Sequence, residues 1–159
     1  MKRNLFLLFL IVSLASCVTT ARRGDFARQV DFTLEMDGFR EYKWGTSVEE
    51  IGHALIPEGS DERRNIEWFT KKDDPLSIGR ANLEGITYVF DAGRFVAVSI
   101  ITQGLSNYKA LREKLEERLG KIQPPNEDIF TWDLAHTVVL FSYNKQSDVA
   151  MLVIRGKGY

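Results

Sequence analysis

The sequence contains very little cysteine, histidine and proline: one Cys, two His and four Pro among 159 residues. One Cys excludes a disulfide framework and a cysteine-rich metal site, and two His leave little material for a histidine-based site. The numbers of basic and acidic residues are nearly equal, 21 and 22, so the charge of the chain does not favour a nucleic-acid partner. With 44% hydrophobic and 27% charged residues, the rest of the composition is that of an ordinary globular domain.

No apolar run is long enough to span a bilayer, and the longest lies at the N-terminus. Residues 5–12 are all apolar and follow the basic pair Lys2-Arg3. A stretch of this length is too short to cross a bilayer core of about 30 Å, but it is typical of a signal peptide. The run leads into Leu14-Ala15-Ser16-Cys17, which is a branched apolar residue, two small residues and a Cys. This segment resembles the lipobox of bacterial lipoprotein precursors.

The lipobox resemblance implies cleavage between Ser16 and Cys17, a diacylglyceryl group on the Cys17 sulfur, and acylation of the new amine by a fatty acid such as palmitate. Val18 follows the Cys where an Asp would favour retention in the inner membrane. The resemblance therefore implies the outer membrane, facing the periplasm, when the source has two membranes. We expect a cleaved signal peptide over residues 1–16, a lipidated Cys and flexible tether over 17–30, and one domain over 31–159. Membrane lipid is then a partner through acylated Cys17, and the mature protein does not span the bilayer.

Hydrophobic periodicity within the domain predicts seven strands and two helices. The strands are expected at residues 32–36, 66–70, 85–90, 94–102, 129–134, 137–143 and 149–155. A short helix begins at Ser47, which has capping-box spacing to Glu50, and Pro57 prevents its continuation. A longer helix is capped by Ser106 and ends at Gly120.

These elements predict an α+β fold with two layers, an antiparallel sheet carrying two helices on one face. Short connections between consecutive strands favour antiparallel pairing. The order of elements also suggests a pseudo-repeat of a helix plus a three-strand meander, over residues 47–103 and 106–155. Trp68 and Trp132 lie in the first strand after each helix.

The domain resembles small envelope lipoproteins of bacteria, and it is similar in shape to the two-layer domains of β-lactamase-inhibitor-like proteins and of outer-membrane-assembly lipoproteins. The residues that carry this resemblance are Trp44-Gly45-Thr46-Ser47, Gly85, Tyr88, Phe90, Gly93-Arg94-Phe95, Tyr108, Leu111, Leu115, Leu119-Gly120 and Trp132. The resemblance implies a fold and a location in the cell envelope.

The last two expected strands are apolar at both alternating positions, which is unusual for a sheet with helices on one face only. We therefore expect part of the second face to contact an envelope protein or a second copy of the chain. The residues of this predicted interaction face are Val139, Phe141, Tyr143, Met151 and Val153. In an alternative interpretation, the strand expected at residues 32–36 covers the face with Phe32, Leu34 and Met36.

Candidate catalytic residues are few. Asp133 and His136 have the spacing of an orienting carboxylate and a base, and Ser99 or Ser142 would complete a hydrolase triad. Both serines are expected inside strands without the glycines of a nucleophile elbow, so a plain turn histidine is the favoured interpretation. The Asp73-Asp74 pair is interpreted as a solvated turn.

A set of three tryptophans, Trp44, Trp68 and Trp132, could form an aromatic sheet face that binds a small ligand or lipid, but core packing explains them better. No loop has the oxygen ligands of a Ca²⁺ site, and no glycine-rich phosphate loop occurs. The sequence therefore predicts a non-catalytic interaction or assembly module without metal or cofactor. An envelope hydrolase and a ligand-binding module remain as alternatives.

Overall fold

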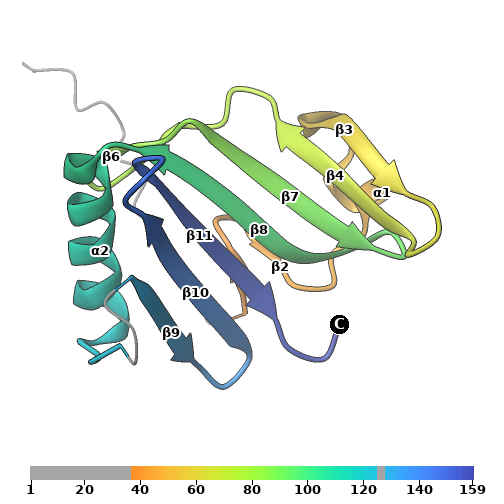
Figure 1. Cartoon of the computed structure of the whole chain (residues 1–159). Helices are drawn as coiled ribbons and strands as arrows, with labels where there is room; N and C mark the ends of the chain where they lie inside the picture. Colours follow the sequence, from red (N-terminus) through yellow and green to blue (C-terminus); the bar gives the residue numbers. More distant parts are fainter. Residues whose placement is uncertain (1–36, 125–127) are drawn as a thin grey trace, which may run out of the picture.

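The computed structural model describes residues 37–124 and 128–159, and its main feature is one large sheet (Figure 1). Seven strands form this sheet in the order β3-β4-β7-β8-β11-β10-β9, and every neighbouring pair is antiparallel. The strands are β3 (Leu55–Asp61), β4 (Ile66–Lys71), β7 (Gly85–Asp91), β8 (Arg94–Gln103), β9 (Ile129–Asp133), β10 (Thr137–Asn144) and β11 (Val149–Gly156). The predicted α+β class with an antiparallel sheet is confirmed.

The two halves of the chain join in the middle of this sheet. Strands β3, β4, β7 and β8 follow one another, and α2 (Leu105–Leu119) then leads to β9. The last three strands run back across the sheet, so that β11 pairs with β8. The expected meander of three strands is correct for the second half and wrong for the first, which has four long strands.

The unexpected fourth strand is β3, whose first residues continue the apolar periodicity of the short helix and are predicted to end that helix. That helix, α1 (Val48–Ile51), has the predicted capping box: the Glu50 backbone N–H donates to Ser47 Oγ over 3.3 Å, and the Ser47 N–H donates to the Glu50 carboxylate over 2.9 Å. A 3₁₀ turn follows at Gly52–Ala54. Pro57 therefore lies in an edge strand, where a missing backbone N–H is tolerated.

Two small hairpins accompany the sheet. The first consists of β1 (Gly38–Phe39) and β2 (Tyr42–Lys43), and the second of β5 (Ser77–Ile78) and β6 (Ala81–Asn82). In the first hairpin a Cβ added to Gly38 would lie 2.1 Å from the Tyr42 carbonyl oxygen, so only glycine allows this close approach. The strand predicted at residues 32–36 lies outside the described residues.

Helix α2 is the longer helix, and its buried stripe agrees with the prediction. Tyr108, Leu111 and Leu115 are buried against the sheet, and Gly120 ends the helix with a φ of 88°. The predicted N-cap Ser106 is wrong. The cap is Gly104, with a φ of 96° and no side-chain capping bond, because the strand turns directly into the helix there.

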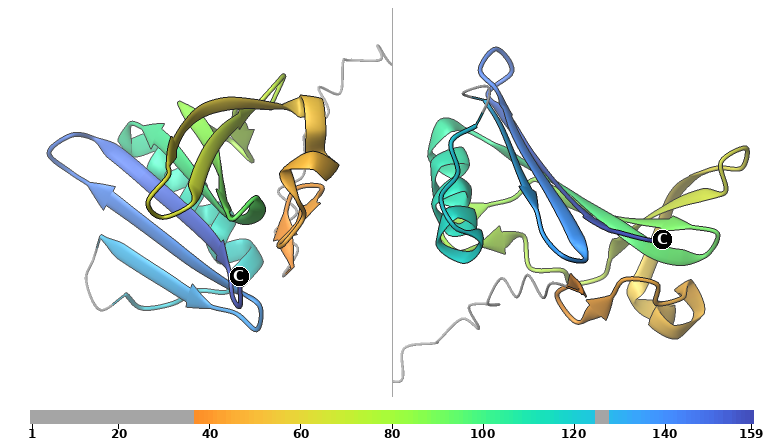
Figure 2. Two further views of the ribbon diagram at one scale, coloured as in Figure 1. Left: turned by 90° about the vertical axis from the view of Figure 1, so that its right-hand side faces the viewer. Right: turned by 90° about the horizontal axis from the view of Figure 1, so that it is seen from below.

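The helices and the N-terminal hairpin lie on the same side of the sheet, as Figure 2 shows from two further directions. The side chains that the sheet directs toward them form the core, which includes Tyr88, Phe90, Ile100, Leu152 and Ile154, all fully buried. No described element covers the other side, which faces the viewer in Figure 1. Over the described ranges, no helix has both the length and the apolar character needed to cross a membrane.

Candidate functional site: an open sheet face and a buried polar cluster

Strand register decides which side chains belong to each face of the sheet. Val139 lies opposite Ile154, and Phe141 lies opposite Leu152. All four side chains are fully buried, so these positions face the helices. Side chains alternate between the two faces along a strand. The residues between them therefore point to the uncovered side.

Eight residues of the uncovered side form two adjacent register rows across β8, β11, β10 and β9. The rows are Ile101–Met151–Ser142–Ile129 and Ser99–Val153–Leu140–Thr131. We call these eight residues the open face. Ile101 is 43% exposed, Met151 and Ile129 are 41% exposed, and Leu140 is 36% exposed.

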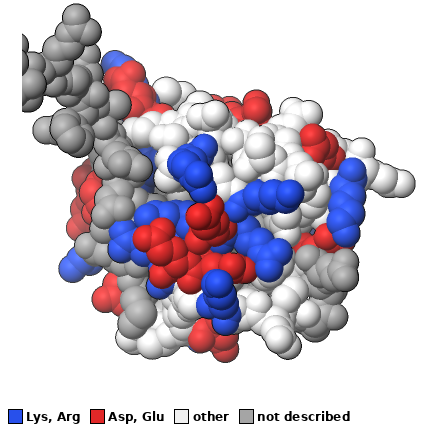
Figure 3. Space-filling model, turned by 90° about the vertical axis from the view of Figure 1, so that its left-hand side faces the viewer, with Lys and Arg blue, Asp and Glu red and all other residues white. Residues whose placement is uncertain are grey.

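The open face carries no charged side chain, whereas 27% of the whole sequence is charged. The side of α2 provides a contrast, since acidic and basic side chains intermingle there (Figure 3). Lys114 and Glu117 pair over 3.0 Å on that helix, and Arg112 pairs with Glu116 over 2.8 Å. The next register row on the same side of the sheet, Ala97–Arg155–Val138–Asp133, contains two exposed charged residues, so the open face is an uncharged patch with a charged row beside it.

The predicted interaction face combined residues from both sides of the sheet. Met151 and Val153 do belong to the open face. Val139 and Phe141 are fully buried, and Tyr143 stacks on Tyr108 of α2 with ring centroids 4.3 Å apart, so the prediction is wrong for these three residues. The error arises because both alternating sets of side chains in these strands are apolar. The sequence therefore does not show which set faces the core until the strand register is known. The alternative cover, residues 32–36, lies outside the described residues.

The residues of the hydrolase alternative are not brought together. Asp133 forms an ion pair with Lys157, and His136 occupies the turn before β10. Ser142 is six residues further along the strand, about 20 Å away at about 3.3 Å per residue. Ser99 is on β8, two strands away from β10. The structure therefore places neither Ser99 nor Ser142 next to this pair.

The three tryptophans do not share one surface. Trp44 and Trp132 are 5% and 3% exposed and belong to the core. Their indole N–H groups donate to Thr137 Oγ1 over 2.9 Å and to the Gly120 carbonyl oxygen over 2.8 Å. Trp68 is half-buried on β4. Core packing thus accounts for two of the three, and a continuous aromatic sheet face is absent from the described residues.

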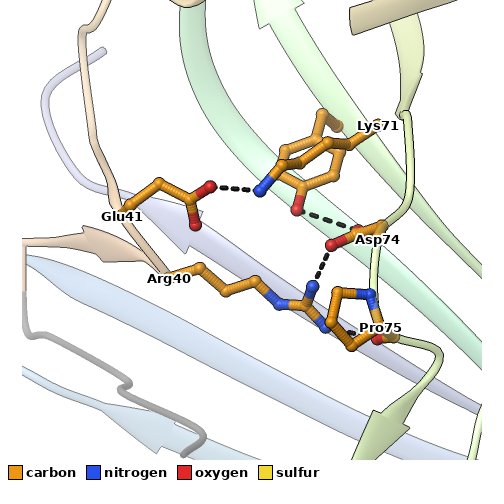
Figure 4. Close-up of polar contacts among 6 residues, drawn as sticks. Arg40, Glu41, Lys71, Asp74 and Pro75 are labelled. Atoms are coloured by element: carbon orange, nitrogen blue, oxygen red, sulfur yellow. Dashed lines mark hydrogen bonds and ion pairs between the residues drawn. The ribbon is translucent and has the colours of Figure 1, made fainter. Parts of the chain in front are cut away.

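A buried polar cluster lies between the N-terminal hairpin and the sheet (Figure 4). The Arg40 guanidinium donates to an Asp74 carboxylate oxygen and, over 2.7 Å, to the Pro75 carbonyl oxygen. The Tyr88 hydroxyl donates to the other Asp74 oxygen over 3.0 Å. The Arg40 and Asp74 side chains are only 6% and 5% exposed, so the interpretation of Asp74 as a solvated turn residue is wrong.

Burial governs the proton affinities in this cluster. It lowers the pKa of the Arg40 guanidinium and raises the pKa of the Tyr88 hydroxyl, because burial disfavours the charged form of each group. Beside them Lys71 pairs with Glu41 and lies 5.2 Å from the centre of the Tyr42 ring. Partial burial raises the pKa of Glu41, but the hydrogen bond and charge of Lys71 outweigh it and the net pKa is lowered.

The buried donors and acceptors of this cluster satisfy one another. Among the described residues, no buried side-chain nitrogen or oxygen is left without a hydrogen-bond partner. None of the described Asp, Glu and His residues gather in a group of three or more that could hold a metal ion. The cluster therefore ties the N-terminal hairpin to the loop after β4. Sequence spacing could not reveal it, because 34 residues separate Arg40 from Asp74.

Two of the hollows in the described surface combine aromatic with charged side chains. One, of about 370 Å³, is lined by Tyr108, Arg112, Phe130, Tyr143 and Lys145 among others. In it Arg112 lies 4.4 Å from the Phe130 ring centre and bonds Glu116, so its charge already has partners.

The other hollow, of about 410 Å³, has Lys43, Trp44, His136, Lys157 and Tyr159 in its lining. Lys157 bonds Asp133 and the Leu134 carbonyl oxygen. The charge of Lys157 in this hollow therefore already has partners.

Comparison with known proteins gives no relative: no family model matches the chain, and neither a curated protein nor a solved structure matches it.

Proposed function

We propose that the protein is a lipid-anchored module of the bacterial cell envelope that binds a protein through the open face and catalyses no reaction. The lipobox of Leu14-Ala15-Ser16-Cys17 supports the anchor. The open face supports the binding role, and it is the single observation that carries the proposal. An anchored domain with an uncharged, exposed sheet face is suited to recognise a neighbour in the same membrane.

The physical argument for binding rests on solvation. Four residues of the open face are large hydrophobic side chains, each exposed by 36% or more. Covering them releases apolar surface from water at about 25 cal/mol per Å². The open face has no charged group whose desolvation would oppose that gain. A partner with an equally uncharged surface therefore fits this site.

The anchor follows from the chemistry of Cys17. One acyl chain gives marginal, reversible attachment, whereas two or more give stable attachment at about 0.8 kcal/mol per buried CH₂. Residues 17–30 then connect the acylated residue to the domain. A tether of fourteen residues with the reach of a flexible coil would span about 20 Å, enough to lift the domain clear of the headgroups. Val18 after the Cys favours the outer membrane, on its periplasmic side, in a bacterium with two membranes.

Mass spectrometry of the mature protein, extracted from its native membrane, tests the anchor. We expect an N-terminal peptide that begins at Cys17 and carries a diacylglyceryl group. The variant Cys17→Ser serves as the control and should retain residues 1–16. A wild-type protein that still begins at Met1 with a free thiol would contradict the anchor.

Cross-linking followed by capture of the tagged mature protein from native membranes tests the binding role. A partner that uses the open face should be lost with Met151→Lys, because the new charge must be desolvated on binding. Ser106→Lys is the matched control, since Ser106 is an exposed residue on α2. Both variants should keep the urea unfolding curve of the wild type. A partner that is retained by Met151→Lys would refute the assignment of the open face.

A further inference from the structure

We draw no further inference here: the strongest candidate, the uncharged and partly exposed apolar patch on β8, β11, β10 and β9, belongs to the binding site already described, and nothing in the structure shows what covers it.

Discussion

At the scale of single residues, the Arg40–Asp74 ion pair is the feature on which the N-terminal hairpin depends. Both side chains are almost fully buried, and Arg40 adopts a positive φ of 55° in the turn of that hairpin. A buried charge that loses its partner is strongly destabilising, whereas replacing both members with apolar groups is often neutral. The two substitutions should therefore be far from additive.

We predict that Arg40→Met lowers the free energy of unfolding by about 3–5 kcal/mol, because it leaves the Asp74 carboxylate buried beside Tyr88 alone. The double variant Arg40→Met/Asp74→Leu should be more stable than either single variant. Urea unfolding of the four proteins in a double-mutant cycle measures this coupling. Additive effects would show that the two side chains act independently.

Tyr143 provides a second residue-scale test, through its proton. Its hydroxyl donates to Asp148 Oδ1 over 2.5 Å, and this hydrogen bond to a carboxylate raises the pKa of Tyr143 to about 12. The folded state thus holds the proton more tightly than the unfolded chain, whose tyrosine pKa is about 10. The resulting stability is present in full below pH of about 10 and is lost as the pH rises from about 10 to about 12.

We predict that Asp148→Asn returns the Tyr143 pKa toward about 10, since the amide does not disfavour the tyrosinate by charge. Ultraviolet titration of the wild type against Tyr143→Phe identifies the contribution of this tyrosine, and the same difference in the Asp148→Asn background measures the shift. Equal titration of Tyr143 with and without the carboxylate would contradict the assigned cause.

At the scale of elements, the start of α2 is set by backbone conformation rather than by a side-chain cap. Gly104 has a φ of 96°, which is costly for any residue with a Cβ. The Tyr108 N–H donates to the Gly104 carbonyl oxygen over 3.0 Å, so the helix begins directly at this glycine.

We predict that Gly104→Ala lowers the free energy of unfolding by about 1–3 kcal/mol, whereas Ser106→Ala changes it by less than about 0.5 kcal/mol. Ser106 is exposed and is not the N-cap. Thermal or urea unfolding of both variants checks the order of the effects. A larger loss for Ser106→Ala would restore the capping role that its position in the sequence predicts.

At the scale of the whole molecule, the fold is asymmetric across its sheet. The helices, the N-terminal hairpin and the buried polar cluster all stabilise one side, and no described element covers the other. Neighbouring residues of β10 therefore have opposite roles. Phe141 is fully buried in the core, and Leu140 is 36% exposed on the open face.

We predict that Phe141→Ala costs about 3–5 kcal/mol of stability, whereas Leu140→Ala costs less than about 1 kcal/mol. Under conditions that favour cross-linking on the membrane, Leu140→Ala should weaken association and Phe141→Ala should act only through folding. Urea unfolding and cross-linking yield measure the two effects separately. Similar stability losses at both positions would show that Leu140 is covered in the folded protein.

The sequence by itself determined the elements whose causes are local. The strands at 66–71 and 85–91, and the three strands between residues 129 and 156, follow from short apolar runs bounded by turn residues. The capping box at Ser47 and the Gly120 helix end follow from neighbours within a few residues. It also determined the α+β class, because short connections between adjacent strands leave antiparallel pairing as the simplest solution.

Only the tertiary structure decided which side of the sheet each apolar residue of β10 and β11 occupies. Odd and even positions of both strands are apolar, so the sequence does not show which set faces the core, and the strand register does. It alone turned residues 55–61 into an edge strand, where pairing with β4 overrides the helical periodicity that continued to Pro57. It alone joined Arg40, Asp74 and Tyr88, because ion pairs between distant segments leave no periodic trace in a sequence. Interactions between residues close in sequence determine the helices and strands, and contacts between distant segments determine which side chains are buried.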